Sequence, residues 1–118
     1  MAPTVSQLVN EGVLEPKAVG QMATYDAAIL CAKTEGVISA PETNHALATV
    51  VDEAKKAKEE GKEKVILFNW SGHGLIDLAA YDQYLAGNLT DFALPEAEIA
   101  EAEKVLENHP KPETIKSR

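Results

Sequence analysis

The residues best suited to chemistry lie in a short loop, 71–74, directly after the apolar run "VILFN" at 65–69. Ser71 offers a hydroxyl that donates and accepts hydrogen bonds, and Gly72 allows the backbone to approach a ligand closely. A second polar loop, "SAPETNH" at 39–45, carries Glu42. If both loops follow parallel strands, they meet at the edge of the sheet where open α/β folds bind ligands.

Familiar catalytic and cofactor motifs do not explain this loop. A G-x-S-x-G nucleophile elbow needs glycines where Asn69 and His73 stand. The ending of a Walker loop is absent, and two glycines do not make a dinucleotide fingerprint. We expect no metal site, because the residues that could bind one lack ligand spacing: His45, His73, His109 and Cys31. The remaining alternative is a turn that needs glycine only for its geometry.

The elements that must position these loops follow from apolar spacing and from helix start and stop signals. The expected helices cover residues 3–11, 22–35, a segment beginning within 41–44, 77–86 and 95–106. A short strand is expected within 37–42, a buried one at 65–69, and an edge strand or linker at 13–20. The order predicts a βαβ unit over 37–86 with a right-handed crossover. The predicted fold class is α/β, a partial open parallel sheet of two or three strands flanked by helices.

We expect two parts, residues 1–94 as the main domain and 95–118 as a C-terminal helix and tail. In 95–106 the residues Ile99, Ala102, Val105 and Leu106 recur at helical spacing and predict a helix whose apolar side docks on the main domain. The polar, proline-containing remainder is expected to be mobile.

Composition narrows the possible functions. The 118 residues include 45% hydrophobic and 25% charged residues, as in an ordinary globular domain. A formal net charge of -8 has the wrong sign for binding nucleic acid or an anionic membrane surface. No apolar run approaches the roughly 20 residues that span a bilayer, and no signal peptide is visible. We therefore expect a cytoplasmic protein, in which the single Cys31 is a packed core thiol.

Two motifs, taken together, resemble a known family. The segments "EGVISAPETNHAL" at 35–47 and "KVILFNWSGHG" at 64–74, followed by "DLAAYDQYL", resemble the C-terminal part of tryptophan synthase β chains. Family members carry forms close to E-G-I-I-P-A-x-E-S-x-H-A and N-L-S-G-R-G. The similarity runs from about residue 4 to residue 90. His73 in place of the usual arginine, and the acidic C-terminal extension, resemble the second class of these chains.

The resemblance implies a fold-type II enzyme that uses pyridoxal 5'-phosphate (PLP) to make L-tryptophan from L-serine and indole. Ser71 then matches the residue that hydrogen-bonds the pyridine nitrogen, and Gly72 matches the residue that lets the backbone pass close to the ring. Glu42 matches a glutamate beside the cofactor, or else it favours a helix N-terminus. The role of the family's arginine does not transfer to His73.

The parts that would complete the enzyme are not found in this sequence. No lysine lies in the family's Schiff-base context, so no catalytic residue is assigned; those considered are Lys17, Lys33, Lys55, Lys56, Lys58, Lys62 and Lys64. We expect a fragment that is inactive alone, that does not hold PLP stably, and that partners the remainder of the β chain and possibly an α chain. Unpaired strand edges predict homo-oligomerisation. The alternative is a stand-alone interaction or small-ligand binding module.

Overall fold

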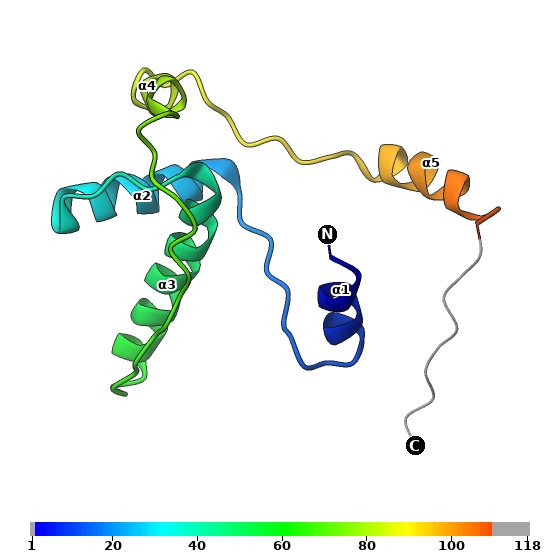
Figure 1. The fold of residues 1–118 in the computed structure, drawn as a ribbon, viewed down its shortest axis with the longest axis horizontal. Coiled ribbons are helices and arrows are strands. Elements are labelled where there is room, and N and C mark those ends of the chain that lie inside the picture. The colour runs from blue at the N-terminus through cyan, green and yellow to red at the C-terminus, as the bar shows by residue number, and fades with distance from the viewer. Residues whose placement is uncertain (1, 110–118) are drawn as a thin grey trace.

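A computed structural model describes residues 2–109, which form five helices in chain order (Figure 1). These are α1 Pro3–Asn10, α2 Gln21–Glu35, α3 Pro41–Glu59, α4 Leu78–Leu85 and α5 Glu96–Leu106. All five expected helices are confirmed, with small differences at their ends. The expected mobile tail falls mostly on residues 110–118, outside the described residues.

Two glycines end helices as the sequence predicts. Gly36 follows α2 with a φ of 71°, and its N–H donates to the carbonyl of Ala32. Gly87 follows α4 with a φ of 73°. A left-handed conformation is cheap only for glycine, so each helix stops where the next residue can turn away.

The core is small and lies between α2, α3 and α4. Alanines let α2 and α3 approach each other closely, and one cluster between them consists of Ala27, Cys31, Leu47 and Ala48. A second cluster joins α2 to α4 through Tyr25, Ala28 and Tyr81. The Tyr25 ring meets the Tyr81 ring edge-on at a centroid distance of 5.1 Å and stacks on the Tyr84 ring at 5.3 Å. Aromatic contacts therefore fix α4 on α2.

The expected parallel sheet is wrong, since no strand occurs among residues 2–109. Residues 63–71 run extended beside α3 (Figure 1), and none of their N–H or C=O groups has a backbone partner in the described part of the chain. The run 65–69 is not buried on both faces, because Val65 and Leu67 are 99% and 95% exposed. A strand exists only by pairing, and no described segment pairs with this one. The right-handed βαβ crossover fails for the same reason.

The C-terminal helix also differs from expectation. Within the described residues α5 contacts no other helix, and its apolar residues Ile99 and Val105 are 42% and 66% exposed. Figure 1 shows α5 at the end of an extended connection, well away from α2 and α3. The expected docking is therefore wrong, since the apolar side of α5 contacts no other helix in the described part of the chain.

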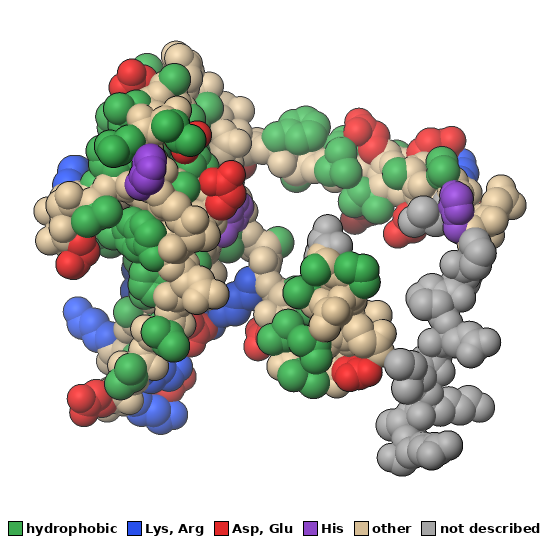
Figure 2. All heavy atoms as spheres, viewed as in Figure 1, with side chains coloured by type: hydrophobic (Ala, Val, Ile, Leu, Met, Phe, Trp, Pro, Cys, Tyr) green, Lys and Arg blue, Asp and Glu red, His purple; other side chains and the backbone are tan. Residues whose placement is uncertain are grey.

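The surface has two kinds of region (Figure 2). Lysine and acidic side chains gather at the far end of α3, while hydrophobic side chains reach the surface around α2 and α4. No helix in the described part of the chain is long and apolar enough to cross a membrane.

Candidate functional site

The two loops singled out from the sequence do meet. Gly74 N–H donates to the carbonyl of Ile38 at 2.9 Å, and Ala40 N–H donates to the carbonyl of Gly72 at 3.0 Å. Ser39 and His73 form an isolated bridge between them, and it is antiparallel rather than parallel. The loops are therefore brought together as expected, but by the antiparallel return of the chain after α3.

Glycine at positions 72 and 74 of the second loop is explained by the close approach of the first loop. A Cβ on Gly74 would lie 2.4 Å from the carbonyl oxygen of Ser39 and 2.8 Å from Cγ2 of Ile38. A Cβ on Gly72 would lie 3.2 Å from Cβ of Ala40. The close approach that these glycines permit is to the neighbouring loop, so contact of Gly72 with a cofactor stays a prediction.

Ser71 is exposed and rests on a buried hydroxyl. Thr43, in the first turn of α3, is 1% exposed, and its Oγ1 lies 2.9 Å from Oγ of Ser71. The same Oγ1 lies 3.4 Å from the carbonyl oxygen of Gly72. The structure thus places the Ser71 hydroxyl at the surface with one partner beneath it. Its outward side is open to a ligand.

Glu42 lies next to Thr43 in α3, but its side chain lines a separate pocket of about 360 Å³ between the starts of α2 and α3. This pocket is lined by Val19, Gln21, Thr24, Tyr25, Pro41, Glu42 and His45. Ser71 is not among these residues, so the structure does not bring Ser71 and Glu42 into one pocket. Burial, with Tyr81, Asp77 and Glu42 nearby, raises the pKa of Tyr25 and keeps its hydroxyl neutral.

A buried polar network holds the loop 37–40, α3 and α4 together. Ser39 Oγ donates to Asn44 Oδ1 at 2.5 Å, and Asn44 Nδ2 donates to the Tyr81 hydroxyl at 3.1 Å. That hydroxyl donates to the carbonyl of Ser39 at 2.5 Å. All three residues are buried. The network fixes the first turn of α3, which carries Thr43, the hydrogen-bond partner of Ser71.

Sequence reasoning missed this network. It took Asn44 as a start signal of a helix, whereas α3 begins at Pro41 after Ala40 and has no side-chain cap. The available signal was an amide in the first turn of a helix, on the face that also carries Leu47 and Ala48.

Two aspartates lie at helix starts. Asp77 precedes α4 as predicted, but its side chain makes no capping hydrogen bond. Asp91, which sequence reasoning missed, accepts a hydrogen bond from Met22 N–H at 2.9 Å and so caps α2 from a distant loop. The two residues are 69 positions apart, which no local pattern reveals.

The remaining candidates are local or buried. His73 is exposed, and its Nδ1 accepts a hydrogen bond from Leu75 N–H at 3.3 Å, as a loop residue does. Cys31 is 8% exposed, and burial together with nearby Glu35 raises the pKa of its thiol. The expectation of a packed core thiol is confirmed. In the described part of the chain, no three His, Cys, Asp or Glu residues are close enough to hold a metal ion.

Comparison with known proteins finds tryptophan synthase beta chains. The tryptophan synthase beta chain of Thermococcus gammatolerans is 56% identical over 92 residues, which is 78% of this chain and 21% of the relative. Tryptophan synthase beta chain 2 of Pyrococcus abyssi is 52% identical over the same shares. That of Aquifex aeolicus is 53% identical over 76% of this chain and 21% of its own length. No protein-family model matches the chain.

These identities are far above the level at which homology is in doubt, and they cover most of the described residues. The chain spans about a fifth of the length of the curated relatives that it matches. The chain therefore belongs to the tryptophan synthase β-chain family, of which it corresponds to a C-terminal part.

Proposed function

We propose that this chain supplies the Ser71 loop to a PLP-dependent enzyme that makes L-tryptophan from L-serine and indole. The observation that carries the proposal is the junction of the two family motifs, where Gly74 and Ile38 are hydrogen-bonded and Ser71 is held at the surface. The homologues are tryptophan synthase beta chains, which supports the same activity.

The exposed hydroxyl of Ser71 fits the ring nitrogen of PLP. When bound, the cofactor supplies an electron sink for bonds at the α-carbon of an amino acid. The Ser71 hydroxyl would donate to the ring nitrogen, and being neutral it would leave that nitrogen unprotonated. A carboxylate at this position would instead favour the protonated ring. Gly72 and Glu42 are also proposed beside the cofactor, and Glu42 would have to reach it from the separate pocket that it lines.

We propose that the chain alone is inactive and does not hold PLP stably. No lysine lines the Glu42 pocket or contacts Ser71 among the described residues. The proposed partners are the remainder of a β chain, a second copy of this chain and an α chain, and the proposed location is the cytoplasm. As the alternative, a small-ligand binding or interaction module would use the same two loops without chemistry.

The decisive experiment mixes this chain with the four-fifths of the Thermococcus gammatolerans β chain that it does not match. With PLP, L-serine and indole, we expect tryptophan only when both pieces are present, because each piece lacks residues that the other supplies. The chain alone should show no PLP absorbance after dialysis. A mixture that forms a complex without tryptophan would favour the interaction module.

Ser71→Asp in the same mixture tests the serine. The new carboxylate should keep the ring nitrogen protonated and change the absorbance of the bound cofactor. Ser71→Asn, which is neutral and of similar size, is the matched control and should change the spectrum less. Identical spectra for wild type and Ser71→Asp would show that Ser71 does not face the ring.

Self-association is proposed from the extended segment 63–71, whose backbone groups are unpaired in the described part of the chain. Another extended segment completes such groups, and antiparallel pairing of two copies around Leu67 places apolar residues opposite each other. In a parallel, in-register pair Lys62 and Lys64 would face their own copies, so the antiparallel arrangement is favoured.

A further inference from the structure

The contact between Thr43 and Ser71 joins a buried hydroxyl to an exposed one. Thr43 is 1% exposed, and its position is set by Pro41 at the start of α3 and by its neighbour Asn44, which belongs to the buried network. Ser71 projects from the loop, with its Oγ 2.9 Å from Oγ1 of Thr43. The rigid partner of the pair is therefore Thr43.

Each hydroxyl carries one hydrogen atom, so the direction in which one hydroxyl donates limits the direction of the other. Thr43 can donate to Ser71 Oγ at 2.9 Å or to the carbonyl of Gly72 at 3.4 Å. Hydroxyl hydrogen bonds ordinarily span about 2.5–3.0 Å, so the contact with Ser71 is the stronger of the two. Either hydroxyl can donate in this contact, and in both cases it holds Oγ of Ser71 beside Thr43.

We propose that Thr43 is a positioning residue that fixes the rotamer of Ser71. A fixed rotamer holds the Ser71 hydroxyl at one place on the surface, where a ligand atom can meet it. That this atom is a pyridine nitrogen rests on the proposed function, whereas the positioning does not.

The test measures the side chain of Ser71 by NMR in the whole chain without cofactor. In the wild type the two three-bond couplings between Hα and Hβ of Ser71 should be one large and one small, or both small, as one rotamer requires. Thr43→Val keeps the shape and removes the hydroxyl, and should average both couplings to intermediate values. Thr43→Ser restores the hydroxyl and should restore the wild-type couplings. Unchanged couplings in Thr43→Val would overturn the proposal. Because no cofactor is present, these results are independent of the tryptophan assay, so either proposal can fail alone.

Discussion

Gly74 is the residue on which the junction of the two loops depends. Its N–H bonds Ile38, and the site of its missing Cβ is filled by the backbone of Ser39. The sequence suggested that glycine served close approach to a ligand or turn geometry. The structure supports a third reason, the approach of another loop, which a single sequence cannot reveal because the loops are 35 residues apart.

Gly74→Ala should therefore destabilise the chain by about 1–3 kcal/mol, the usual cost of overpacking. A backbone atom 2.4 Å from the new Cβ has to move, and the hydrogen bond to Ile38 moves with it. Urea unfolding followed by helix circular dichroism measures the change. Gly72→Ala is the matched control and should cost less, since its new Cβ meets a methyl group at 3.2 Å. Equal costs would contradict the assigned contact.

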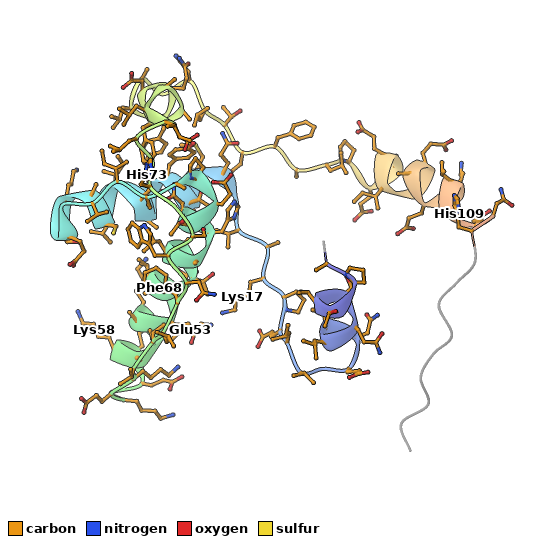
Figure 3. All side chains as sticks on the ribbon, in the orientation of Figure 1. Lys17, Glu53, Lys58, Phe68, His73 and His109 are labelled. Carbon is orange, nitrogen blue, oxygen red and sulfur yellow. The ribbon has the colours of Figure 1, made fainter. Side chains whose placement is uncertain are left out.

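Glu53 shows a different residue-scale effect, on charge. Its carboxylate contacts Lys17, Lys56 and Lys64 at 2.8, 3.1 and 3.3 Å, and thereby ties the α1–α2 linker and the extended segment to α3 (Figure 3). Hydrogen bonds from these lysines, Lys17 first, lower the pKa of Glu53 from 4.5 to about 2. The hydrogen bond to Glu53 likewise raises the pKa of Lys17.

The stabilisation by Glu53 should consequently depend on pH. The pKa is lower in the folded chain than in the unfolded one, so the contribution is complete above about pH 4.5 and is lost as the pH falls toward 2. The difference in unfolding free energy between wild type and Glu53→Gln should shrink over that range. Carbon NMR of the carboxyl group gives the midpoint directly, and a value near 4.5 would refute the ion-pair cluster. Concentrated salt should weaken the ion pairs between Glu53 and the three lysines.

At the scale of elements, α4 is held by its tyrosines. Tyr81→Phe should cost about 1–3 kcal/mol of unfolding free energy, because the carbonyl of Ser39 loses its donor and Asn44 loses its acceptor in a buried site. Tyr84→Phe is the control. It removes only an exposed hydroxyl bond to Asp26 and should cost less. A Tyr81→Phe variant as stable as Tyr84→Phe would mean that the network does not anchor α4.

The helices were predictable from the sequence because their signals are local. Alanine-rich composition marks α2, an apolar stripe marks α3, and Gly36 and Gly87 mark helix ends. The expected strand at 65–69 was predicted wrongly, because a continuous apolar run forms a strand only when a neighbouring segment pairs with it. The same limit applies to the cap that Asp91 places on α2 and to the position of α5. Each depends on contacts between distant residues.

For the candidate site, the sequence predicted correctly that the loops around Glu42 and Ser71 belong together. It did not predict that their side chains face different surroundings, since Ser71 rests on Thr43 and Glu42 lines a pocket with Tyr25. Glu42 and Thr43 are consecutive residues of α3, and a helical rotation of about 100° per residue turns their side chains apart.

At the scale of the whole molecule, the core is too small to cover the extended segment. We expect sedimentation between 10 and 500 µM to show self-association that grows with concentration. Leu67→Pro should abolish it, because proline removes the backbone donor of an exposed residue without breaking an existing bond. Leu67→Thr keeps that donor and should still associate. If neither variant associates, the apolar side chain of Leu67 rather than strand pairing drives association. If both variants associate, the backbone donor of residue 67 is not needed.

Trp70 gives this segment a built-in reporter. It is the only tryptophan in the sequence, it is 40% exposed, and it lies between Phe68, whose ring centroid is 6.1 Å away, and the loop that begins at Ser71. The wavelength of its emission maximum and its accessibility to dissolved quenchers therefore report on the surroundings of residues 63–71 of this chain. A companion polypeptide that shields the stretch would shift the fluorescence to shorter wavelength, and the titration would need no label.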